Sequence, residues 1–117
     1  NQLAVAGTMI GVCEALVYAG RAGVDPEKLV AVISKGAAGC WTLDNLAPRI
    51  IKGDDEPGFM VDHFVKDLGI ALDECEQMGI KLHGLELADR LYKQLQTLGH
   101  GQSGTQALIH AIEQLSA

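Results

Sequence analysis

A lysine and an aspartate stand side by side at positions 66 and 67, in a stretch whose apolar residues recur at helical spacing. A helix over residues 61–78 would turn Lys66 and Asp67 away from its apolar side. That apolar side carries Val61, Phe64, Val65, Leu68, Leu72 and Cys75. A charged pair in this position can face either solvent or a cleft, and only in a cleft can it act on a bound molecule. In the solvent alternative, Lys66 pairs with Asp62 one turn earlier, which is worth about 0.2–0.5 kcal/mol.

The elements that must position this pair are all predicted to be helices, and no stretch of the sequence favours a strand. We expect helices over about 1–22, 26–35, 61–78, 85–98 and 106–115, with a short helix from about Trp41 that Pro48 interrupts or kinks. Asp25 is the expected N-cap of the second helix and Thr105 that of the last one, while Gly79 ends the long helix. Residues 52–58 read as an exposed, charged loop.

The first predicted helix is apolar around nearly its whole circumference, which is typical of a helix enclosed by neighbours. Small residues at positions 4, 7, 11 and 15 form one narrow face on which another backbone can approach closely. We therefore expect tight helix packing at this face, either within the chain or across a dimer. The chain has 117 residues, of which 48% are hydrophobic, so one domain with one core is expected.

Composition excludes several classes of partner. A formal net charge of −6 argues against binding to a phosphate backbone, so we expect no nucleic-acid partner. The apolar run over residues 3–19 is short for a membrane span and contains Glu14, so we expect no membrane partner. Three cysteines without a CxxC pair favour a reducing compartment, here the cytoplasm.

The remaining candidate residues have plain structural readings. His83, His100 and His110 show no metal-ligand spacing, so no metal site is predicted. Trp41 is the only tryptophan, and we expect it in the core. His63, one turn before Lys66, is expected on the surface.

Several ordered motifs together resemble the C-terminal helical domain of the β-hydroxyacid dehydrogenases. This family includes 3-hydroxyisobutyrate dehydrogenase, tartronate semialdehyde reductase (2-hydroxy-3-oxopropionate reductase) and the glyoxylate and succinic semialdehyde reductases. The resemblance spans nearly the full length, although no single motif would suffice. The motifs are Asn1-Gln2, Gly36-Ala37-Ala38-Gly39-Cys40-Trp41, Pro48-Arg49, Gly53-Asp54, Pro57-Gly58-Phe59 and Lys66-Asp67-Leu68-Gly69-Ile70-Ala71-Leu72.

The resemblance implies an all-α fold, a helical bundle with a long first helix like the C-terminal domain of 6-phosphogluconate dehydrogenase. Residues 1–117 would then form the substrate-binding and dimerisation domain of a two-domain enzyme, whose N-terminal Rossmann domain binds NAD or NADP. Such an enzyme transfers a hydride between the nicotinamide and a small 3-hydroxy acid or its semialdehyde. A homodimer or tetramer is implied, and the uncapped helical start at Asn1 fits a chain cut from something longer.

The resemblance also assigns roles to individual residues. The family's catalytic lysine would lie three residues before Asn1, where its ammonium would act as general acid on the developing alkoxide. Asn1 and Gln2 would hydrogen-bond the substrate or orient that lysine. Lys66 would approach the nicotinamide half of the cofactor or the substrate, and Asp67 would orient Lys66 or position the substrate.

Three further residues are implied to border the substrate. Phe59 would wall the substrate pocket, or alternatively anchor its loop in the core. Gly36 and Gly39 would permit a tight backbone path beside the substrate, although glycines between helices are more often turn residues. Cys40 stands where the family usually has a serine, and such departures put the substrate's identity in doubt.

A second interpretation comes from a different functional class. The chain could be a non-catalytic helical dimerisation or interaction module of the same fold, because its first helix suggests association. The residue three places before Asn1 discriminates the two interpretations, since a lysine there favours the enzyme.

Overall fold

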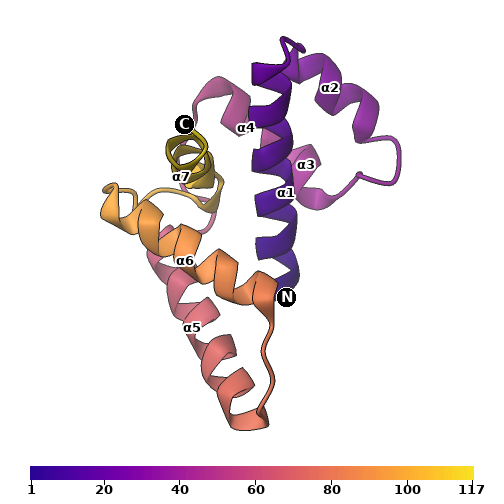
Figure 1. Cartoon of the computed structure of the whole chain (residues 1–117). Helices are drawn as coiled ribbons and strands as arrows, with labels where there is room; N and C mark the ends of the chain where they lie inside the picture. Colours follow the sequence, from indigo (N-terminus) through magenta and orange to yellow (C-terminus); the bar gives the residue numbers. More distant parts are fainter.

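Seven α-helices and one 3₁₀ turn make up the chain, and no strand forms, so the all-α prediction is confirmed. The computed structural model describes all of residues 1–117. Figure 1 shows α1 near the middle of the molecule, with α2 and α3 on one side of it and α5, α6 and α7 on the other. The helices are α1 (Gln2–Arg21), α2 (Pro26–Ile33), α3 (Trp41–Asn45), α4 (Ala47–Lys52), α5 (Val61–Met78), α6 (His83–Thr97) and α7 (Leu108–Leu115), with the 3₁₀ turn η1 at Thr105–Ala107.

Most helix limits follow the local signals in the sequence. The Asp25 carboxylate accepts a hydrogen bond from the Glu27 amide and caps α2 as predicted. The break between α3 and α4 falls at Leu46, with Pro48 in the first turn of α4, and Gly79 ends α5 in the left-handed conformation with a φ of 71°. The limits of α5 are those predicted from the apolar stripe.

The prediction that Thr105 caps the last helix is wrong. Thr105 is buried within η1, and its carbonyl oxygen accepts a hydrogen bond from the Tyr92 hydroxyl at 3.0 Å. Its amide donates to the carbonyl of Phe59, so Thr105 ties the entrance of α5 to the turn before α7. Thr105 therefore makes tertiary hydrogen bonds, although threonine before a helix usually serves as a local cap.

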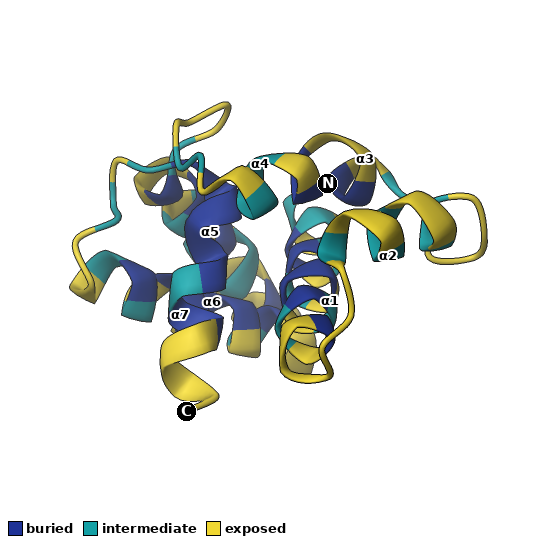
Figure 2. Ribbon diagram, turned by 90° about the horizontal axis from the view of Figure 1, so that it is seen from above, coloured by how far each residue is buried: buried dark blue, intermediate teal, exposed yellow.

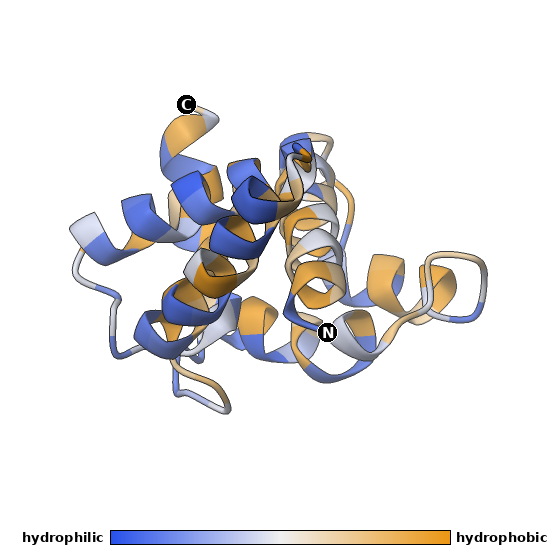
Figure 3. Ribbon diagram, turned by 90° about the horizontal axis from the view of Figure 1, so that it is seen from below, coloured by the Kyte–Doolittle hydropathy of each residue, from blue (hydrophilic) through white to orange (hydrophobic).

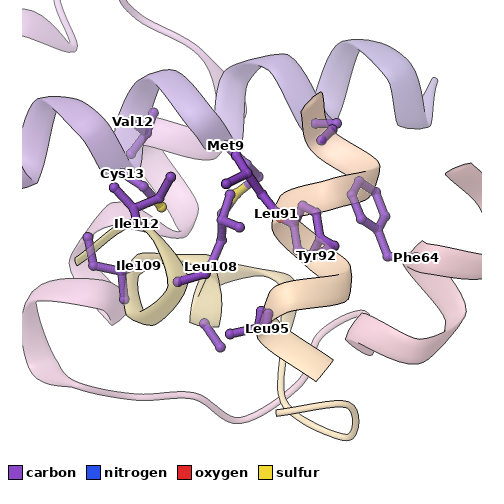
Figure 4. Close-up of a cluster of buried hydrophobic side chains, with 14 of the residues drawn as sticks. Met9, Val12, Cys13, Phe64, Leu91, Tyr92, Leu95, Leu108, Ile109 and Ile112 are labelled. Carbon is purple, nitrogen blue, oxygen red and sulfur yellow. The ribbon is translucent and has the colours of Figure 1, made fainter. Parts of the chain in front are cut away.

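The core lies where α1, α6 and α7 meet, and α5 packs against α6. Figure 4 shows Met9 and Cys13 of α1, Tyr92 of α6 and Leu108 of α7 pointing toward one another. These four side chains are fully buried, and burial of each large one stabilises the fold by about 1.5–3 kcal/mol.

Only one face of the first helix is fully buried. Its buried residues are Ala6, Met9, Val12, Cys13, Leu16 and Ala19. In contrast, Gly7 and Gly11 are exposed, a Cβ at either would meet nothing within 4 Å beyond the adjoining backbone of α1, and Tyr18 is 77% exposed. Figure 2 shows both buried and exposed stretches on α1, and Figure 3 shows how much hydrophobic colour α1 carries. The expected enclosure of α1 is thus not provided by this chain, and the small-residue face is not packed within it.

By length and apolar composition, α1 could also cross a membrane. In this fold its apolar residues pack against α6 and α7 instead, as in the central helix of a helical bundle.

Candidate active site

A cleft with a volume of about 800 Å³ opens beside the start of α1. Its walls come from the first two turns of α1, from α3 and α4, from the end of the loop before α5, and from η1. Polar side chains line much of it: Asn1, Gln2, Thr8, Thr42, Asn45, Arg49, Thr105 and Gln106. These neutral amides and hydroxyls, with one guanidinium, form a site suited to a small polar molecule.

The predicted residues Asn1 and Gln2 lie in this cleft and connect it to α5. The Gln2 side-chain amide donates a 2.9 Å hydrogen bond to the Asp67 carboxylate, and the Asn1 amide donates to the Gln2 side-chain oxygen at 3.0 Å. Gln2 and Asp67 are 65 positions apart, so only the packing of α1 near α5 joins them. Asp67 therefore orients the Gln2 amide at the mouth of the cleft.

Lys66 is exposed on α5 and lies outside the lining of the cleft, as Asp67 does. The alternative pairing of Lys66 with Asp62 does not form, because the Asp62 carboxylate instead accepts a hydrogen bond from the Gln96 amide at 2.9 Å. No carboxylate neutralises the Lys66 ammonium. It is therefore free to pair with an anion brought against this face.

Two aromatic side chains form part of the cleft wall. Phe59 is 42% exposed, and its ring meets that of the buried Phe64 edge-on at 6.2 Å. Phe59 therefore borders the cleft and also anchors its loop. Both roles considered from the sequence, pocket wall and loop anchor, are compatible with this position. Trp41 also borders the cleft and is 65% exposed, so the prediction that it lies in the core is wrong. As the first residue of the five-residue helix α3, Trp41 lies at the edge of the packed layers.

Gly36 and Gly39 lie in the connection between α2 and α3, and neither lines the cleft. Their predicted place beside a substrate stays a prediction. Gly39 has a clear structural role, because a Cβ there would lie 2.5 Å from the Ser34 carbonyl oxygen. The next residue, Cys40, does reach the cleft, and its sulfur accepts a hydrogen bond from the Leu43 amide at the start of α3.

Sequence reasoning missed the threonine pair at the floor of the cleft. The hydroxyls of Thr8 and Thr42 are 2.6 Å apart, and the Thr8 hydroxyl also donates to the Val5 carbonyl. Thr42 is buried, so this contact holds α3 against α1. Thr8, a hydroxyl residue between apolar residues of the first helix, was the available signal.

Arg49 was also missed as a site residue, although its motif carried the family resemblance. Its guanidinium bonds the Asp54 carboxylate at 3.1 Å and the carbonyl of Glu56. The hydrogen bond from Arg49, together with that from the Glu56 amide, holds the pKa of Asp54 below its usual value. Arg49 thus fixes the loop before α5 while its side chain borders the cleft.

Gln106 also holds the loop before α5. It is 1% exposed, and its amide donates to the carbonyls of Asp54 and Glu56 at 3.0 and 2.8 Å. The Gly104 amide donates to the Asp55 carbonyl. The charged stretch that the sequence presents as a loose surface loop is therefore held from two sides.

Comparison with known proteins gives a consistent result. The family model described as "NAD-binding of NADP-dependent 3-hydroxyisobutyrate dehydrogenase" matches residues 1–112. An Arabidopsis thaliana protein named "Probable 3-hydroxyisobutyrate dehydrogenase-like 1, mitochondrial" is 52% identical over 99% of this chain.

Solved structures agree with the sequence comparison. The 3-hydroxyisobutyrate dehydrogenase of Mycobacterium tuberculosis, solved with L-serine, superposes over 96% of the chain with a TM-score of 0.87 and 26% identity. That of Salmonella typhimurium superposes over 93% with a TM-score of 0.86 and 29% identity. The chain spans 35% of the length of the Arabidopsis protein and 40% and 38% of the two solved chains, in that order.

Proposed function

We propose that this chain, which belongs to the family of NADP-dependent 3-hydroxyisobutyrate dehydrogenases, is the C-terminal helical domain of an NAD(P)-dependent β-hydroxyacid dehydrogenase. Residues 1–117 would supply the substrate cleft and the oligomer interface, and an N-terminal Rossmann domain would supply the rest of the site. The observation that carries the proposal is the 2.9 Å bond from the Gln2 amide to Asp67, which fixes a side chain that lines a cleft of about 800 Å³.

The substrate class follows from the chemistry of the cleft. A small 3-hydroxy acid has a carboxylate and a hydroxyl, and its semialdehyde has a carbonyl in place of the hydroxyl. The amides of Asn1 and Gln2 can donate to either oxygen, while Phe59 and Trp41 would form the apolar part of the wall beside the substrate. L-serine, named with the Mycobacterium structure, is itself a 3-hydroxy carboxylate.

The residues present fit a nicotinamide cofactor at the mouth of the cleft. Bound there, NAD or NADP would accept or supply the hydride. Lys66 would pair with a cofactor phosphate or the substrate carboxylate, because its ammonium has no partner within the chain. A lysine three residues before Asn1 would protonate the alkoxide formed when the aldehyde is reduced.

The first experiment measures NADH and NADPH oxidation by the complete enzyme with glyoxylate, succinic semialdehyde, tartronate semialdehyde and methylmalonate semialdehyde. Lys66→Ala should lower kcat/KM by about tenfold or more, since it removes a charge-assisted contact worth about 1.5–3 kcal/mol. Lys28→Ala is the matched control, because Lys28 is an equally exposed lysine on α2.

No turnover of any of these substrates would contradict the proposal. Equal losses in Lys66→Ala and Lys28→Ala would return Lys66 to an ordinary surface residue while leaving the enzyme class intact. A residue other than lysine three places before Asn1 would favour the second candidate, a non-catalytic dimerisation module of the same fold. That candidate is supported by the uncovered apolar and small-residue face of α1.

We also propose the cytoplasm as the compartment, with the mitochondrial matrix as the alternative that the name of the Arabidopsis protein suggests. The three cysteines are free thiols, which fits either compartment because neither favours disulfides.

A further inference from the structure

Three metal-ligating side chains meet on the far side of the loop that borders the cleft. Asp55, His100 and His110 each offer a ligand atom, and these atoms all lie within 4.8 Å of one another. They come from the loop before α5, from the turn after α6 and from α7. His110 follows His100 by 10 positions, and His100 follows Asp55 by 45. Such separations match no metal-ligand spacing in the sequence, so only the tertiary fold brings the three residues together.

We propose that Asp55, His100 and His110 form a binding site for a divalent transition-metal ion of the zinc class. Two imidazoles with one carboxylate are a ligand set that Zn²⁺ and its neighbours accept, with the remaining positions filled by water. The side chains of His110 and Asp55 are 36% and 33% exposed, so an ion can reach them from solvent.

The existing contacts already approach a coordination sphere. His110 Nε2 lies 2.9 and 3.1 Å from the two carboxylate oxygens of Asp55, so these two groups are already in direct contact, and an ion bound between them would replace that contact. His100 Nδ1 lies 3.0 Å from the Ser103 hydroxyl, a partner of the kind that orients metal-bound histidines through their second nitrogen. Ser103 leaves the Nε2 atom of His100 available.

A modest rearrangement would complete the site. The rings of His100 and His110 are stacked, with centroids 4.6 Å apart and planes at 15°, so their lone pairs do not yet converge. Ligands on a tetrahedral zinc ion lie roughly 3.4 Å apart, given bonds of about 2.1 Å. Completing the site requires the His100 ring to turn so that its Nε2 faces Asp55 and His110.

Local charge favours a cation at this position. Residues 54–56 are all acidic, and only Asp54 is neutralised by an arginine. The proposed site would also join three chain segments, one of which continues into Gly58 and Phe59 of the cleft wall. Metal binding would therefore fix that wall, and it needs no dehydrogenase activity to be observed.

The test is a titration of the 117-residue chain with Co²⁺, followed by its ligand-field absorption, with Zn²⁺ as competitor. We expect saturable binding of one Co²⁺ ion and its displacement by Zn²⁺. In His100→Ala and His110→Ala the Kd for Co²⁺ should be at least about tenfold higher. The control is His83→Ala, because His83 is an exposed histidine at the start of α6. Its affinity should equal that of the unchanged protein.

His100→Ala is the decisive variant, since His100 lies in a surface turn and its one polar side-chain partner is Ser103. Circular dichroism verifies that each variant keeps its helices, and Zn²⁺ should raise the Tm of the unchanged protein but not that of His100→Ala. Equal affinity in His100→Ala and the unchanged protein would overturn the proposal. A sulfur-to-cobalt charge-transfer band, which would assign the ion to a cysteine, would do the same.

Discussion

At the scale of single residues, burial separates three cysteines that look alike in the sequence. Burial, with a smaller contribution from Glu113 and Glu14, raises the pKa of Cys13 to about 12, whereas Cys40 is only partly buried and reaches the cleft. A thiol with that pKa is ionised in about one molecule in ten thousand at pH 8. Buried cysteines of this kind act as small hydrophobic residues.

We therefore expect Cys40 to react with iodoacetamide first, and Cys13 and Cys75 to react only when the protein unfolds. Mass spectrometry of the alkylated peptides at pH 8, with and without urea, measures the order. The Cys40→Ser variant is the control and should remove the fast phase. Early alkylation of Cys13 in the folded protein would contradict the packing of α1 against α7.

The Arg49–Asp54 pair predicts a pH effect at the same scale. The bond from Arg49 lowers the pKa of Asp54, so its contribution to stability is present above the usual aspartate pKa and is lost as the pH falls through the lowered value. In Arg49→Gln the pKa of Asp54 should rise toward its usual value, as read from carboxyl NMR titration. The stability difference between the two proteins should shrink as the solution is acidified. A difference that grows on acidification would show that Asp54 is not the partner.

At the scale of elements, the connection between α2 and α3 depends on close backbone approach. A Cβ at Gly39 would lie 2.5 Å from the carbonyl oxygen of Ser34, a backbone atom that cannot easily move, while one at Gly36 has no atom nearer than 3.9 Å. The two glycines therefore differ, although the sequence presents them as equivalents. The carbonyl of Gly36 also accepts the amide of Gly39 in a 3.0 Å turn bond.

Gly39→Ala should lower the free energy of unfolding by roughly 1–3 kcal/mol, the usual cost of forcing atoms into a packed site. Gly36→Ala is the matched control and should change it by less than about 0.5 kcal/mol. Urea unfolding followed by circular dichroism measures both. Equal effects of the two substitutions would mean that the tight turn relaxes at no cost.

At the scale of the whole molecule, this chain leaves uncovered the face of α1 that carries Gly7, Gly11 and Tyr18. Glycine in the middle of a helix costs about 1 kcal/mol relative to alanine, so two exposed glycines are poor choices for a helix that stays in solvent. They suit a face on which a second backbone packs. This argument supports the proposed homodimer or tetramer.

Sedimentation of the chain at high concentration should therefore show a dimer or larger species. Gly11→Lys should shift it to the monomer with unchanged helix content, because a Cβ at Gly11 meets no atom within 4 Å beyond the adjoining backbone of α1. Thr97→Lys, at an exposed position on α6, is the control and tests whether an added positive charge alone disperses the oligomer. A monomer at all concentrations in the unchanged protein would contradict the proposed interface.

The elements were predictable because their signals are local. The apolar spacing of 61–78 gave the limits of α5, Asp25 and Pro26 gave the start of α2, and Pro48 gave the break between α3 and α4. The wrong predictions also have physical reasons. Thr105 makes a buried tertiary hydrogen bond with Tyr92 instead of capping the last helix. Trp41 lies on a helix too short to carry it into the core.

What the sequence by itself determined is the helical fold, the family and the chemical types of the candidate residues, because each of these depends on residue type and near-neighbour spacing. Only the tertiary structure decided which residues share a site. The bond from Gln2 to Asp67, the contact of Thr8 with Thr42 and the meeting of Asp55 with His110 join positions 65, 34 and 55 residues apart. No periodicity encodes such contacts, because they arise only when packed helices bring separate segments together in a common core.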